Sequence, residues 1–117
     1  MPEQEKDLDL KEIGHFTGTQ GYTNVLGLNA TDGIVYIMKA GYSWFVTDMA
    51  IIIKSKFKDE EFLCVKLEVD TQKNTAKAII DDGNGNVLYT QDYKYTDAKR
   101  DLKLFCTDNV IMLNSEY

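Results

Sequence analysis

The sequence predicts an α+β fold in which a short N-terminal helix and two central helices pack on a five-stranded antiparallel β-meander. Between residues 31 and 58 the apolar residues recur at helical spacing, and after residue 61 they recur at every second position. Short turn-forming segments separate the alternating stretches. Short loops favour a meander, and one face of such a sheet can bury the apolar sides of the helices.

The chain has 117 residues, of which 44% are hydrophobic and 27% charged. This composition is typical of one globular domain. We expect residues 7–117 to form a single α+β domain and residues 1–6, which hold the only proline, to be a flexible N-terminus.

Residues 7–14 predict the short N-terminal helix. Leu10 and Ile13 lie three positions apart and share one helix face, and Gly14 can end the helix in a left-handed conformation. A turn-rich connector follows, and residues 22–29 can hold a short extended piece.

The two central helices are predicted from their capping residues. Thr31 or Asp32 can accept backbone amide hydrogen bonds at the start of the first helix, and Gly41 can end it. The second helix is expected to begin near Ser43. The β-branched run 51–53 also fits a strand, but the length of the apolar stripe favours a helix.

Alternation of apolar and polar residues predicts the strands in the second half of the chain. The five predicted strands cover residues 62–69, 75–80, 87–95, 102–106 and 110–113.

The loop 82–86, Asp-Gly-Asn-Gly-Asn, joins two of these strands. Its residues tolerate positive φ angles, which is typical of a hairpin connection. Its alternating oxygens resemble the start of a calcium-binding loop, but Val87 and Tyr93 stand where that motif needs glycine and glutamate. We therefore predict a hairpin turn here and no metal site.

The charge balance disfavours two classes of partner. Nineteen acidic against 13 basic residues give a net charge of −6, which repels both nucleic-acid phosphate and anionic lipid. No secretion signal and no apolar stretch of membrane-spanning length is present, so we expect a cytoplasmic protein without direct nucleic-acid or membrane contact.

Catalytic and metal-binding constellations are weak. Cys64 and Cys106 lie in alternating segments and are expected to be reduced core residues. A zinc site or a nucleophilic pair would have to gather these distant cysteines around His15, the only histidine. We predict no catalytic residue, no metal and no cofactor.

Aromatic residues give two local hypotheses, each with a structural alternative. Tyr89, Tyr93 and Tyr95 share one face of a predicted strand, where they can form a contact or pocket surface or simply pack across the sheet. Trp44 and Asp48 lie one helical turn apart. They can form a contact patch, or Trp44 can lie in the core while Asp48 binds a loop amide or the indole N–H.

Several short segments together carry a family resemblance. They are Phe16-Thr17-Gly18-Thr19, Thr31-Asp32-Gly33, Ala40-Gly41-Tyr42, Asp82-Gly83-Asn84-Gly85-Asn86-Val87, Tyr95-Thr96-Asp97 and Ser115-Glu116-Tyr117. In this order, over residues 13–117, the sequence resembles the DUF6876 family. The resemblance implies a context of small bacterial, phage and plasmid proteins, and it supplies no activity and no catalytic residue.

From these features we expect a non-enzymatic accessory protein of a mobile element that binds a host or defence protein, as an anti-CRISPR-like inhibitor does. An acidic protein can occupy a basic nucleic-acid groove on such a defence protein. The candidate contact residues are Asp59, Glu60, Glu61, Tyr89, Tyr93, Tyr95, Trp44 and Asp48.

Two further expectations accompany this one. The alternative function is a small-molecule or nucleotide-binding module with a tyrosine-lined pocket between helices and sheet. A homodimer is also expected, formed by pairing of an exposed last strand that ends near Tyr117.

Overall fold

The computed structural model describes residues 21–94, 96 and 98–117. The predicted N-terminal helix, the flexible segment 1–6 and Tyr95 lie outside the described residues. The strands are β1 (Thr23–Val25), β2 (Leu28–Ala30), β3 (Phe62–Asp70), β4 (Thr75–Asp81), β5 (Val87–Tyr93), β6 (Leu102–Thr107) and β7 (Val110–Leu113). The helical elements are α2 (Asp32–Ile37), the π-turn η2 (Met38–Tyr42), α3 (Ser43–Lys56) and the 3₁₀ turn η3 (Asn114–Glu116).

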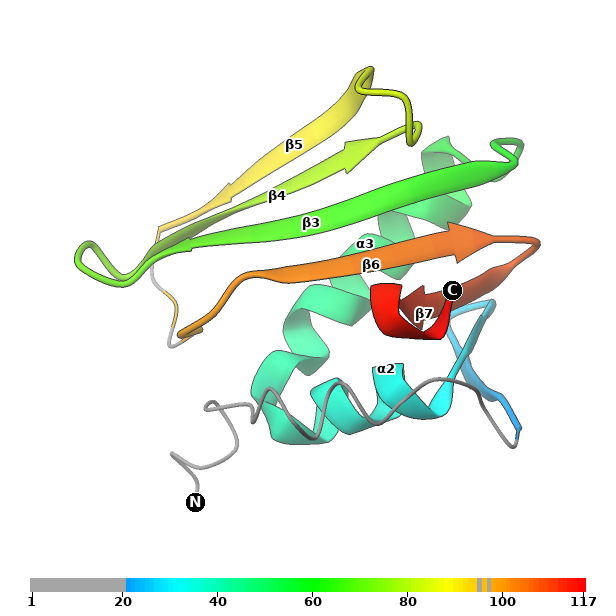
Figure 1. The fold of residues 1–117 in the computed structure, drawn as a ribbon, viewed down its shortest axis with the longest axis horizontal. Helices are drawn as coiled ribbons and strands as arrows, with labels where there is room; N and C mark the ends of the chain where they lie inside the picture. The colour runs from blue at the N-terminus through cyan, green and yellow to red at the C-terminus, as the bar shows by residue number, and fades with distance from the viewer. Residues whose placement is uncertain (1–20, 95, 97) are drawn as a thin grey trace.

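These strands form one mixed sheet in the order β1-β2-β7-β6-β3-β4-β5, with α2 and α3 on one side of it (Figure 1). Strands β2 and β7 are parallel, and every other neighbouring pair is antiparallel. The α+β class is therefore confirmed, with seven strands instead of the predicted five.

The predicted meander is wrong because β6 pairs with β3 and not with β5. The alternate residues Leu102, Leu104 and Cys106 of β6 are buried, whereas Tyr89 and Tyr93 of β5 are only half-buried. A strand with one fully buried side gains more at the centre of the sheet than a half-buried strand does, so β5 remains at the edge and the chain crosses over to β6.

The last strand is also not an edge, which corrects the expected position of β7. It lies between β6 and β2, because the β1–β2 hairpin extends the sheet beyond it. Asn109 fixes this hairpin: its side chain donates to the Gly27 carbonyl at 2.9 Å, and its own carbonyl accepts from the Asn29 amide at 2.9 Å. Among the described strands, the edges are β1 and β5.

The first central helix begins at its predicted cap, whereas α3 follows Tyr42 and has no side-chain cap. The Thr31 hydroxyl accepts from the Ile34 amide at 3.4 Å, and α3 begins at Ser43. Gly41, at φ 107°, breaks the helical path between α2 and α3. The two central helices are unequal, because α2 has six residues and α3 is the one long helix of the described chain, with 14. Residues 51–53 are helical.

The core lies between α3 and the sheet. Tyr42, Phe45 and Met49 are fully buried and belong with Val65 and Leu104 to one apolar cluster. No helix within the described part of the chain is long and apolar enough to cross a membrane.

Candidate functional site

The strand pleat gives the sheet a helix-free face. On β3, Leu63, Val65 and Leu67 belong to the core, so Phe62 and Lys66 point to the opposite side. The described helices α2 and α3 leave that side uncovered (Figure 1). An exposed sheet face normally carries polar side chains.

Three aromatic residues gather on this face, and we call them the aromatic cluster: Phe62, Phe105 and Tyr117. The ring centroids are 5.2 Å apart for Phe62 and Phe105, 5.4 Å for Phe62 and Tyr117, and 5.0 Å for Phe105 and Tyr117. The Tyr117 side chain is largely exposed, at 72%. Apolar rings at outward positions make this end of the face unlike an ordinary wetted sheet.

The predicted acidic segment Asp59–Glu61 borders the aromatic cluster, because it runs directly into Phe62 at the start of β3. All three acidic side chains are exposed, and within the described residues none of them forms an ion pair. We call this segment the acidic loop.

Two lysines, Lys66 on β3 and Lys103 on β6, lie directly opposite each other further along the same face. We call them the lysine pair. Lys66 approaches Asp81 at 3.9 Å, and the Lys103 ammonium lies 5.5 Å from the Phe105 ring centroid. Like charges at directly opposed positions destabilise a sheet, so the lysine pair has a local electrostatic cost.

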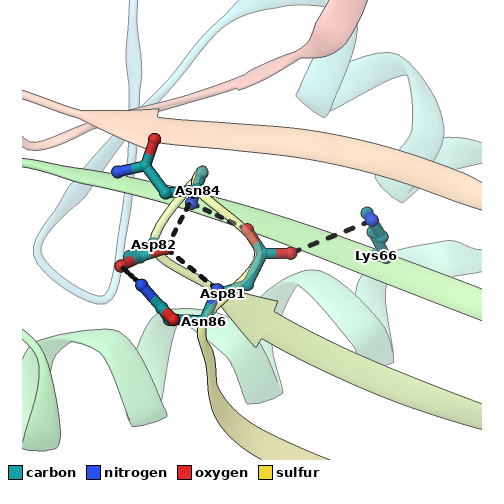
Figure 2. Close-up of polar contacts among 6 residues, drawn as sticks. Lys66, Asp81, Asp82, Asn84 and Asn86 are labelled. Carbon is teal, nitrogen blue, oxygen red and sulfur yellow. Dashed lines mark hydrogen bonds and ion pairs between the residues drawn. The ribbon is translucent and has the colours of Figure 1, made fainter.

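The β4–β5 loop is a hairpin turn stabilised by its own carboxylates, as predicted (Figure 2). Asp81 accepts from the Gly83 amide at 2.7 Å. Asp82 accepts from the Asn84 amide at 2.8 Å and the Asn86 side chain at 2.8 Å. These hydrogen bonds lower the pKa of the Asp82 carboxyl, and the bond from the Asn86 side chain has the largest effect. Both carboxylates already accept hydrogen bonds from groups of the same loop. They therefore stabilise a turn.

This loop also supports the aromatic cluster. A Cβ atom built on Gly83 would lie 2.8 Å from the Phe62 ring, and Gly83 has a φ of +85°. The loop backbone therefore packs closely on Phe62 and limits the positions that this ring can take.

The side chains of Trp44, Asp48 and Tyr93, by contrast, meet on the helix side of the sheet.

 The Tyr93 hydroxyl donates to Asp48 Oδ2 at 3.0 Å, and the Trp44 ring lies edge-on to the Tyr93 ring at 4.9 Å. Burial, and then the Asp48 carboxylate, raise the pKa of Tyr93 above its ordinary value. Trp44 and Asp48 therefore share one side of α3 that packs on β5, and Asp48 accepts from Tyr93 where a loop amide or the indole N–H was expected.

Tyr89 lies on the same side of β5. Its ring is edge-on to Phe57 at 6.4 Å, and the Lys56 ammonium lies 6.0 Å from the ring centroid. Its hydroxyl donates to Gln91 at 3.0 Å. Of the tyrosines predicted to share a strand face, Tyr89 and Tyr93 therefore pack across to α3.

The two cysteines are buried thiols on opposite faces of the sheet. Cys106 lies in the core, and burial raises its pKa to about 11. Cys64 faces the other side, and burial together with the nearby Asp81 raises its pKa. A raised thiol pKa lowers the thiolate fraction and with it the reactivity.

A cavity of about 470 Å³ opens beside Tyr93, at the end of β3, β4 and β5. Its lining includes the charged residues Glu68, Lys77, Asp92 and Lys94. Within the described residues, no group of three or more histidine, cysteine, aspartate or glutamate side chains could hold a metal ion.

Sequence reasoning identified the acidic loop but missed the aromatic cluster and the lysine pair. The signal for the cluster was present in Phe62 and Phe105, which occupy the polar positions of two alternating segments. Tyr117 gave no such signal, because only the folded chain brings its ring onto the other two.

Comparison with known families gives a match to DUF6876, a family of unknown function, over residues 7–117. The chain belongs to the DUF6876 family. No curated protein and no solved structure matches it.

Two of the segments that carry the DUF6876 resemblance contact each other. The Glu116 carboxylate accepts from the Thr31 hydroxyl at 2.6 Å and from the Gly33 amide at 3.1 Å. It also accepts from the Leu113 amide at 2.9 Å. In this DUF6876 chain, Glu116 thereby joins the C-terminal turn to the start of α2 and helps to place Tyr117 in the aromatic cluster.

Proposed function

We propose that this DUF6876 protein is a non-enzymatic accessory protein of a mobile element that binds a host or defence protein in the cytoplasm, in the manner of an anti-CRISPR inhibitor. The contact is the helix-free face of the sheet. The observation that carries the proposal is the aromatic cluster, which places three rings at outward positions beside the acidic loop.

The composition of this surface supports a protein partner. Phenylalanine and tyrosine are enriched at the centres of protein interfaces, where they bury large areas at low entropic cost. Tyr117 is 72% exposed, so much of its ring is available to a partner. The surrounding charged side chains can form the polar rim of the same interface.

The charge of the chain supports a partner with a basic surface. The net charge is −6, and Asp59, Glu60 and Glu61 form a compact exposed group next to Phe62. Opposite charge accelerates association and selects against acidic partners. A nucleic-acid-binding defence protein has a basic surface of this kind.

The test uses a tagged chain expressed in a natural host, followed by quantitative affinity enrichment and a phage-defence assay. Phe105→Glu places a charge inside the aromatic cluster, and Ile51→Glu is the matched control on the outward side of α3, where Ile51 is 54% exposed. Tyr117→Ser is a second variant that leaves the buried sheet unchanged.

We expect the wild type and Ile51→Glu to enrich the same protein and to weaken defence equally, and both cluster variants to lose these effects. Retention of the partner and of the activity by Phe105→Glu and Tyr117→Ser, with all variants folded, would contradict the proposal.

The small-molecule or nucleotide-binding alternative stays a separate prediction. The cavity beside Tyr93 favours it, because Lys77 and Lys94 can contact an anionic ligand. A bound ligand would raise the melting temperature with its concentration. A nucleotide that does so for the wild type, and not for Lys77→Ala with Lys94→Ala, would replace the protein-binding proposal.

A further inference from the structure

We propose that the helix-free face binds a second copy of this chain, with the two sheets packed face to face. This inference rests on the proposed function in one respect, because it takes the same face as a protein-binding surface. It differs from the expected pairing of edge strands, since its contacts come from side chains of β3, β6 and the acidic loop.

Charge complementarity within the face is the first argument. The acidic loop lies at one end of β3, and the lysine pair lies further along the same strand and its neighbour β6. Within the described residues, neither the acidic loop nor Lys103 takes part in an ion pair. The face therefore carries an acidic group and a basic group that are separated on one molecule and can pair between two molecules.

The geometry of β3 lets a two-fold axis bring these halves together. Glu61 and Lys66 are five residues apart, which is about 17 Å along a strand. Consider an axis that lies between the two sheets, crosses the strands at right angles and passes midway between these residues. Each acidic loop then lies over the other copy's lysine pair.

The same axis places the aromatic clusters of both copies at the centre of the contact. Phe62 lies between Glu61 and Cys64 on β3, and Phe105 is the register partner of Cys64. Aromatic side chains would thus be buried in the middle and charged side chains would surround them, which is the usual anatomy of a specific interface.

The edges of the sheet are less suited to dimer formation. Strand β1 has only three residues, and β5 has a register irregularity opposite Ile80 and Asp81. Short edge strands and β-bulges both discourage pairing between sheets of different molecules.

Sedimentation equilibrium of the full-length chain at low ionic strength tests the proposal. The expected mass is twice 13.3 kDa, with association weakened by added salt. Lys103→Glu, and separately Glu60→Lys with Glu61→Lys, should each weaken association roughly tenfold or more. Lys39→Glu is the matched control, because Lys39 is exposed on η2, away from this face.

Mixing the two kinds of charge variant gives the decisive result. In a mixed dimer each reversed group again meets an opposite charge, so the mixture should associate as tightly as the wild type although each variant alone does not. A monomeric wild-type chain at all concentrations, or a dimer that Lys103→Glu does not weaken, would overturn the inference.

The two proposals can fail separately. A monomeric chain whose host partner is lost in Phe105→Glu would refute the dimer and support the proposed function. A dimer that responds to charge reversal, together with host assays that Phe105→Glu leaves unchanged, would support the dimer and refute the proposed function.

Discussion

The Tyr93 hydroxyl donates a hydrogen bond to Asp48 Oδ2 at 3.0 Å, across a sequence separation of 45 residues. This bond joins the edge strand β5 to helix α3. Because Trp44 packs on the same ring, the tyrosine side of β5 holds the edge of the sheet on the helix. The helix-free face is consequently the side of the sheet that α2 and α3 leave uncovered (Figure 1).

Tyr93→Phe tests this connection. The substitution keeps the ring contact with Trp44 and removes only the hydrogen bond to Asp48, so the free energy of unfolding should fall by about 1 kcal/mol. Urea denaturation at neutral pH measures the change. An unchanged midpoint would show that the bond contributes nothing to stability.

The same variant should change the alkaline pH dependence. The pKa of Tyr93 is raised in the folded chain, so the folded state keeps its proton while the unfolded state loses it above about pH 10. The contribution of the protonated Tyr93 to the free energy of unfolding is complete below that pH. It falls as the pH rises towards the folded-state pKa. The fall should be smaller in Tyr93→Phe, and an identical fall in both proteins would contradict the assignment.

Glu116 is expected to stabilise the fold through its three hydrogen bonds to Thr31, Gly33 and Leu113. Glu116→Ala leaves these groups without their acceptor, which should lower the free energy of unfolding by on the order of 2 kcal/mol. Thermal and urea denaturation measure the loss. Glu116→Gln, which keeps one acceptor oxygen, is the matched control and should lose less.

Gly33→Ala tests the same contact from the other side. A Cβ atom there would lie 2.5 Å from Glu116 Oε1 and 2.7 Å from Leu113 Cδ1, so one of these groups must move. We expect a loss of roughly 1–3 kcal/mol. A stability equal to that of the wild type would show that the C-terminal turn is not held as described.

Local elements of this fold could be predicted because their signals are local. The hairpin at 82–86 and the start of α2 at Thr31 both follow from side chains that bond the adjacent backbone. The pairing of β6 with β3 could not be read in this way, because it depends on which strand buries more surface at the centre of the sheet. The three-residue strands β1 and β2 are too short to show alternation.

The candidate site was predictable to a similar extent. Alternation showed that Tyr89 and Tyr93 share a side, but not that this side faces α3. The aromatic cluster depends on the position of Tyr117, which Glu116 fixes through contacts with residues more than 80 positions away in sequence.

The cysteines should remain reduced thiols with low reactivity. Cys106 pairs in register with Leu63, the residue before Cys64, so the two thiols point to opposite faces of the sheet and cannot form a disulfide in the native fold. A thiol reagent should label neither cysteine in the native protein and both in urea. Rapid native labelling of Cys106 would contradict the buried position described for it.

Calcium should leave stability unchanged, because Asp81 and Asp82 already accept hydrogen bonds within the loop (Figure 2). Thermal denaturation with and without calcium chloride measures this. Hydrogen bonding lowers the pKa of Asp82 in the folded chain. The stability that its carboxylate contributes is therefore present above the ordinary carboxyl pKa and is lost as the pH falls. A calcium-dependent rise in melting temperature that Asp82→Asn abolishes would contradict the loop as a simple turn.

The aromatic cluster on the helix-free face is the proposed protein-binding surface. Tyr117→Ser and Tyr22→Ser test it most directly, because both tyrosines are exposed, at 72% and 58%, and only Tyr117 belongs to the cluster. The measurement is the amount of host partner recovered by each variant relative to the wild type. We expect loss of the partner with Tyr117→Ser and full recovery with Tyr22→Ser, and equal recovery by both variants would rule out the aromatic cluster as the contact.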